Sequence, residues 1–159
     1  MATRAQEKKI KKVVKKDAKI HLRQAIKIDP DFLDARYELG SLLLSEGELK
    51  GAEEQFNKVV KLDNNHAEGY YKLALISAEN RKNKKARDLF EKAVTIKFDD
   101  AKIQFDYGLF LKKLKKYEEA IEHFTKAIEA NQNFSEAYFE LAMLLKDPED
   151  YDWAKKNYE

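Results

Sequence analysis

Residues 67–100 read AEGYYKLALISAENRKNKKARDLFEKAVTIKFDD, and residues 101–134 read AKIQFDYGLFLKKLKKYEEAIEHFTKAIEANQNF. Both segments are 34 residues long and align without a gap, with Ala at positions 1, 20 and 27 and Phe at position 24. The same template starts at Leu33 before them and at Ser135 after them. A repeat of this length predicts stacked units, each too small to bury its apolar face alone.

Small and aromatic residues recur at fixed positions of the template. Position 8 holds Gly40, Ala74, Gly108 and Ala142, position 20 holds Ala52, Ala86, Ala120 and Ala154, and position 24 holds Phe56, Phe90, Phe124 and Tyr158. Because a large side chain at a helix crossing would hold two backbones apart, we expect positions 8 and 20 to face each other where two helices of a unit cross. The aromatic ring is expected to fill the remaining space.

A Leu-Gly or similar pair at positions 7 and 8, followed by this Ala and aromatic, resembles the tetratricopeptide repeat, whose unit is a helix-turn-helix. The resemblance implies an all-α fold, a right-handed superhelical α-solenoid. Two family features are mostly missing: position 4 is aromatic only at Tyr70 and Tyr138, and the proline of position 32 is kept only at Pro30.

The register divides the chain into a basic helical extension, residues 1–17, and a repeat array, residues 18–159. The array comprises a partial repeat over 18–32, full repeats over 33–66, 67–100 and 101–134, and a partial repeat over 135–159. Helices are expected over about residues 6–28, 31–46, 49–62, 66–80, 83–97, 100–114, 117–130, 134–146 and 149–158. No strand is expected.

Composition agrees with thin helical layers, since 38% of the 159 residues are charged and 43% are apolar. The chain has no cysteine, which favours an intracellular compartment. It has no apolar run of the roughly 20 residues that a membrane span needs. We therefore expect a soluble cytoplasmic protein, unless a targeting segment lies outside this sequence.

The first 16 residues carry seven basic side chains against a single acidic one, Glu7. With Ile10, Val13 and Val14 they form a short basic amphipathic arm that could bind nucleic acid or an anionic membrane. The alternative is a solvated extension that keeps an exposed repeat end soluble. We favour this alternative because lysines without interleaved aromatics are a weak nucleic-acid signal.

Residues that could carry chemistry are scattered. His21, His66 and His123 lack metal-ligand spacing, so we expect surface or packing roles for them and no cofactor or metal. None of the five glycines lies in a phosphate-binding motif. We therefore do not expect an enzyme.

Resemblance to the family implies that the first helix of each repeat lines a concave groove. Position 5 holds Tyr37, Tyr71, Phe105 and Phe139, and position 9, one turn later, holds Ser41, Leu75, Leu109 and Met143. Lys72 and Lys102 are among the charged residues beside these rows. An apolar stripe with a charged rim predicts binding of a peptide or amphipathic helix. Alternatively, the position-5 rings pack partly against their own neighbours.

Members of the family that capture C-terminal carboxylates place a basic and amide set at defined groove positions. Here those positions hold Tyr37, Ser41, Lys72, Lys102 and Asp106, and only Lys102 matches. Carboxylate capture of that type is not predicted.

The sequence therefore predicts a non-catalytic protein-protein interaction module with an adaptor or scaffold role. One alternative is a structural protein that forms homo-oligomers through its incomplete terminal repeats, where Trp153 and Tyr158 are apolar candidates. Another is a piece of a larger tetratricopeptide protein. The identity of the partner does not follow from the sequence.

Overall fold

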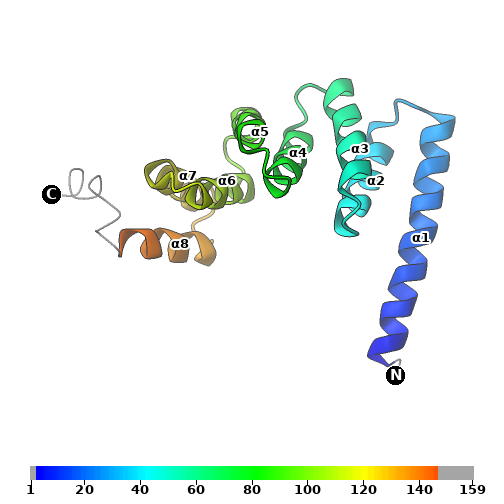
Figure 1. Ribbon diagram of the computed structural model, residues 1–159, viewed down its shortest axis with the longest axis horizontal. Coiled ribbons are helices and arrows are strands. Elements are labelled where there is room, and N and C mark those ends of the chain that lie inside the picture. Colours follow the sequence, from blue (N-terminus) through cyan, green and yellow to red (C-terminus); the bar gives the residue numbers. More distant parts are fainter. Residues whose placement is uncertain (1–2, 147–159) are drawn as a thin grey trace.

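A computed structural model of the chain describes residues 3–146, without the side chains of Lys8, Ile10 and Lys11 (Figure 1). The described residues form eight helices and no strand: α1 (Arg4–Ile28), α2 (Leu33–Ser45), α3 (Leu49–Leu62), α4 (Ala67–Glu79), α5 (Asn83–Ile96), α6 (Ala101–Lys113), α7 (Tyr117–Ala130) and α8 (Ser135–Leu145). Each bound lies within three residues of its prediction. The helix expected over 149–158, which includes Trp153 and Tyr158, lies outside the described residues.

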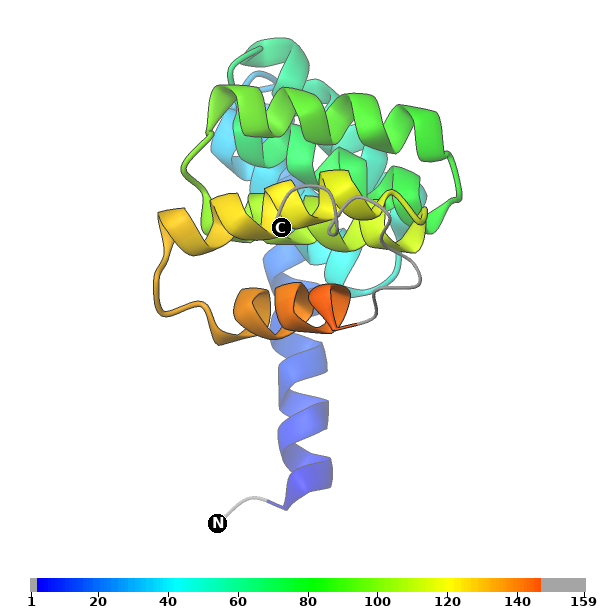
Figure 2. The same cartoon turned by 90° about the vertical axis from the view of Figure 1, so that its left-hand side faces the viewer.

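The helices stack in pairs, α2 with α3, α4 with α5 and α6 with α7, to form an α-solenoid with α1 and α8 at its two ends (Figure 1). The all-α prediction is therefore confirmed. Figure 2 shows that the N-terminal half of α1 projects beyond the packed layers. The basic extension and the second helix of the partial repeat are continuous within this one helix.

Within each pair, the turn is closed by the same backbone device. Gly47, Arg81 and Lys115 occupy position 15 of successive repeats and have positive φ angles of 79°, 57° and 60°. The next residue donates its N–H to a carbonyl five residues earlier, as in Lys82 to Ser77 at 2.9 Å. This left-handed C-terminal cap ends the first helix of each repeat. Only the first of the three uses the glycine that this conformation favours.

The crossing inside each pair confirms the small and aromatic positions of the template. The side chains at positions 20 and 24 of all three full repeats are completely buried. A Cβ at Gly40 would lie 3.0 Å from the Phe56 ring, and one at Gly108 would lie 2.7 Å from the Phe124 ring. The nearest neighbours of these position-8 glycines are therefore the position-24 rings, and not the position-20 alanines that the sequence suggested.

None of the helices described in residues 3–146 combines the length and the apolar character that crossing a membrane requires.

Candidate functional site

The predicted groove residues lie on α2, α4, α6 and α8, which are the first helices of successive repeats. Side chains connect these helices across repeat boundaries. Tyr71 on α4 donates a hydrogen bond to Asp106 on α6, and Lys112 on α6 forms a 2.5 Å ion pair with Glu140 on α8. Side chains therefore link the first helices α4, α6 and α8 to one another along the array.

The position-5 rings are in contact with the position-24 rings of their own repeats. The ring centroids of Tyr37 and Phe56 are 5.7 Å apart, and those of Phe105 and Phe124 are 5.6 Å apart. Tyr71 is only 5% exposed, whereas Phe139 is 62% exposed. The alternative role foreseen for these rings, packing against their own neighbours, thus applies in the three full repeats.

The position-9 residues offer more accessible apolar surface along the first helices. Ser41, Leu75 and Leu109 are half-buried, and Met143 is 45% exposed. Together with Phe105 and Phe139, the three apolar members of this row leave a discontinuous apolar strip along α4, α6 and α8. The strip widens towards α8.

A charged cluster lies at the centre of this surface, on α4 and α6. The Lys102 Nζ lies 3.3 Å from an Asp106 carboxylate oxygen, and the Lys72 Nζ lies 5.2 Å from the centre of the Tyr71 ring. In the described part of the chain, no carboxylate lies within ion-pair distance of Lys72. The cluster therefore has two cations for one carboxylate and leaves Lys72 available to an anionic group.

The environment of this cluster shifts two pKa values. Burial raises the pKa of the Tyr71 hydroxyl, and its hydrogen bond to Asp106 raises it further because ionisation would put two negative charges together. Burial lowers the pKa of Lys72, and the neighbouring charge of Lys102 lowers it further. A ligand carboxylate beside Lys72 would relieve this destabilisation of the ammonium group.

Asp106 is the residue whose role the sequence did not reveal. In the sequence it stands out only as a mismatch to the carboxylate-capture set, whereas the structure makes it the acceptor for Tyr71 of the preceding repeat. Its separation from Tyr71 is 35 residues, one more than the repeat, because position 5 of α4 and position 6 of α6 face each other.

The sequence predicts surface or packing roles for the three histidines; one packs, one is exposed, and one caps a helix. His66 Nδ1 accepts the backbone N–H of Gly69 at 3.0 Å and so caps α4. The centre of the His123 ring lies 4.3 Å from that of the Tyr107 ring, with the two planes tilted by 45°, and its Nδ1 lies 2.7 Å from the side-chain oxygen of Gln104. His21 is exposed. Between residues 3 and 146, no three metal-ligating side chains gather in one place.

The repeat pattern and the helix pairs define a known class of protein. Sequence profiles of the tetratricopeptide repeat match residues 16–76, 67–100, 101–134 and 123–157. The chain belongs to the tetratricopeptide repeat family. No curated protein matches it in sequence.

Solved structures with the same fold include three named proteins with low identity to this chain. MamA is 24% identical, with a TM-score of 0.79 over 98% of this chain and 91% of MamA. PilF of Pseudomonas aeruginosa is 26% identical, with a TM-score of 0.78 over 94% of this chain and 68% of PilF. YrrB, described as a TPR protein with an unusual peptide-binding site, is 28% identical, with a TM-score of 0.70 over 78% of this chain and 64% of YrrB. The family and these neighbours support a protein-interaction module.

Proposed function

We propose that this chain is a non-catalytic adaptor or scaffold that binds a peptide or amphipathic helix along the first helices of its repeats. The observation that carries the proposal is the juxtaposition of the half-exposed apolar strip with Lys72, a cation that has no carboxylate partner among the described residues. Apolar contact supplies affinity in such a groove, and a fixed charge supplies register.

The burial of Tyr71 refines the chemistry of the ligand. Because only 5% of this residue is exposed, it offers little contact area and serves instead to hold Asp106 in place. Leu75, Phe105 and Leu109, with Phe139 and Met143 further along, offer the apolar contacts. The ligand is therefore expected to present apolar side chains on one face and a carboxylate opposite Lys72 and Lys102.

The test starts from a random-peptide display library selected on the wild-type chain. Selected peptides should lose about tenfold or more in affinity for Lys72→Glu/Lys102→Glu, since charge reversal turns attraction of the ligand carboxylate into repulsion. They should also bind Phe139→Ala/Met143→Ala more weakly. The matched control is Lys58→Glu/Lys84→Glu, which changes the net charge equally on two exposed lysines of α3 and α5.

Equal affinity for the groove variants and the control would place peptide binding outside this surface. Failure of the library to enrich any peptide would contradict the proposal itself. Circular dichroism of each variant separates loss of binding from loss of fold.

A second candidate function is self-association through the C-terminal end, and exposed side chains on α8 favour it. Tyr138 and Leu145 are 48% and 40% exposed and lie two turns apart, on a face next to that of Phe139 and Met143. If a second copy covers this face, light scattering should show a mass that rises with concentration, and Tyr138→Ser/Leu145→Ser should reduce it. A monomeric mass at high concentration would contradict this candidate.

A further inference from the structure

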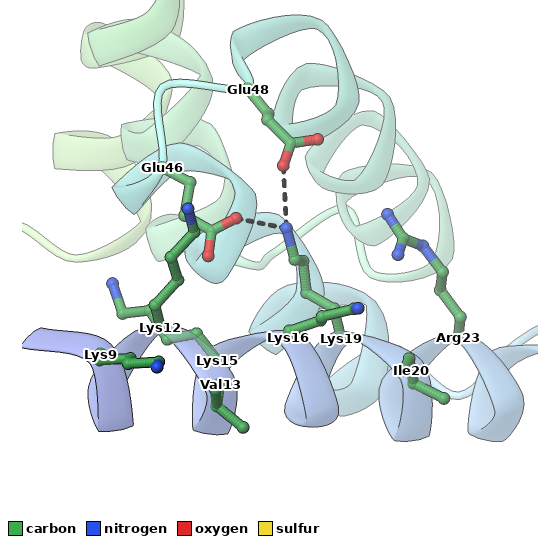
Figure 3. Close-up of a pocket in the computed structure, with 10 residues that line it drawn as sticks. All are labelled: Lys9, Lys12, Val13, Lys15, Lys16, Lys19, Ile20, Arg23, Glu46 and Glu48. Carbon is green, nitrogen blue, oxygen red and sulfur yellow. Dashed lines mark hydrogen bonds and ion pairs between the residues drawn. The ribbon is translucent and has the colours of Figure 1, made fainter.

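A cleft of about 1150 Å³ lies between α1 and the turn that joins α2 to α3 (Figure 3). Six cationic side chains of α1 line it: Lys9, Lys12, Lys15, Lys16, Lys19 and Arg23. The opposite wall carries two carboxylates, those of Glu46 and Glu48. None of these residues belongs to the groove of the first helices.

Two of the six cations are used to hold α1 against the array. The Lys19 Nζ pairs with the carboxylate of Glu46 and, at 3.0 Å, with that of Glu48 (Figure 3). The Lys15 Nζ donates a hydrogen bond to the Ser45 Oγ at 3.1 Å. These contacts position the helix and neutralise one of the cations.

The other four cations have no such partner. No carboxylate in residues 3–146 lies within ion-pair distance of Lys9, Lys12, Lys16 or Arg23. From Lys9 to Arg23 they extend over about 21 Å of helix, at about 1.5 Å per residue. Four uncompensated charges along one line attract an anionic segment of similar length.

The lining of the cleft is also apolar at two points. Val13 and Ile20 are each 53% exposed and lie two helical turns apart, so they share one face of α1. The lysine side chains beside them add aliphatic stems to this surface. An apolar pair at spacing i, i+7 within a basic border is the complement of an acidic amphipathic helix.

We propose that this cleft is a second interaction surface, which binds an acidic amphipathic segment of a partner protein. A flat lipid surface would not enter a cleft with a second wall, and the carboxylates of that wall would repel a continuous run of phosphates. The cleft has no aromatic side chain on which nucleic-acid bases could stack. A helix can place all its carboxylates on the side that faces the cations of α1, and so keep them away from the carboxylates of the opposite wall.

The experiment uses a fluorescently labelled synthetic peptide with Leu at i, i+4 and i+7 and Glu at the flanking positions. Its binding to the wild-type chain is measured by anisotropy at 0.15 M salt, beside a single-stranded oligonucleotide and vesicles containing anionic phospholipid. We expect the peptide to bind in the micromolar range and more tightly than either of the other probes. Tighter binding of the oligonucleotide or the vesicles, or no binding of the peptide, would overturn the proposal.

Two cleft variants and one control locate the binding. Lys12→Glu/Lys16→Glu should lower the affinity for the peptide about tenfold or more, because two attractive contacts become repulsive. Val13→Ser/Ile20→Ser keeps the charge and should lower the affinity for the peptide about threefold. A purely electrostatic contact would not show this loss. Lys58→Glu/Lys84→Glu should leave the affinity within about twofold. Equal affinity of the wild type and the Lys12→Glu/Lys16→Glu variant would overturn the assignment.

The cleft and groove proposals fail separately. Peptides selected on the groove should bind Lys12→Glu/Lys16→Glu as they bind the wild type, and the acidic peptide should bind Phe139→Ala/Met143→Ala as it binds the wild type. If the affinity falls tenfold in either cross-test, the two surfaces are not independent, and the cleft is then not a second interaction surface.

Discussion

The helices of the middle repeats, α4 to α7, and the N-terminal helix α1 are both amphipathic, but they are packed very differently. The middle helices bury completely the alanines and aromatics at positions 20 and 24, such as Ala86 and Phe90. Among the side chains of α1 that the structure describes, none is fully buried, although Ala18 and Leu22 occupy the same two template positions.

The difference shows that a template position becomes core only when a helix lies on both sides of it. Phe90 lies between α4 and α6, in contact with Tyr71 and Tyr107. Leu22 is only partly buried, against the cluster that contains Leu39 and Leu43 of α2. The same template positions are therefore completely buried in the middle of the array and only partly buried in α1.

Replacement of the central ring should have the largest effect. Phe90→Ala removes a completely buried side chain and should lower the free energy of unfolding by about 3 to 5 kcal/mol. Urea denaturation followed by circular dichroism measures this loss. The control on α1, Val14→Ala, should change stability by less than about 0.5 kcal/mol because the side chain is 61% exposed. Similar losses for the two variants would remove the distinction between the regions.

Overpacking at position 20 should give the next largest effect. Ala86→Leu and Ala120→Leu place a large side chain at a completely buried crossing and should each cost about 1 to 3 kcal/mol. Ala18→Leu at the equivalent position of α1 should cost less than about 0.5 kcal/mol, because Ala18 is only partly buried. Thermal melting of the three variants measures this contrast. Unchanged melting of the two middle variants would mean that the register is misplaced.

Acid should destabilise the middle repeats through His123. Burial lowers the pKa of its imidazole to about 4, below the value of 6.5 for the free side chain. Between these pH values the unfolded chain binds the proton and the folded chain does not. The neutral, buried imidazole therefore contributes its full stability above pH 6.5, and this contribution is lost as the pH falls towards 4. Allowing for partial exposure, the loss is on the order of 1 to 2 kcal/mol.

The measurement is urea denaturation at several pH values between 7 and 4, for the wild type and for His123→Gln. The difference between the two curves isolates the imidazole from the carboxylates that titrate in the same acid range. Parallel curves would show that the imidazole is not buried in the neutral form.

The turns between paired helices should give the smallest effect. Arg81→Gly and Lys115→Gly should each stabilise the chain by up to about 1 kcal/mol, since glycine adopts the positive φ angle without the steric cost. Gly47→Ala should destabilise it by about the same amount, because it puts a Cβ into a φ of 79°. Melting temperatures that move in the opposite directions would contradict the left-handed caps.

The sequence alone determined the period, the helix pairs and the core positions. Ala120 and Phe124 follow Ala86 and Phe90 at a spacing of one repeat, 34 residues. This register is compatible with the same helix crossing in each repeat, because a crossing needs a small residue and a large ring side by side. The sequence could also place Gly47 in a turn. The side chains of Arg81 and Lys115 do not indicate the same conformation, since residues other than glycine rarely adopt a positive φ angle.

Tertiary structure decided how much of each predicted groove residue remains exposed. Tyr71 and Phe139 share template position 5, yet Tyr71 is 5% exposed and Phe139 is 62% exposed. The difference arises because Tyr71 packs on Phe90 and is hydrogen-bonded to Asp106. The cleft beside α1 depends likewise on contacts between distant residues, such as Lys19 with Glu46 and Glu48. Local periodicity specifies which face of a helix is apolar, whereas exposure depends on which other helices pack against that face.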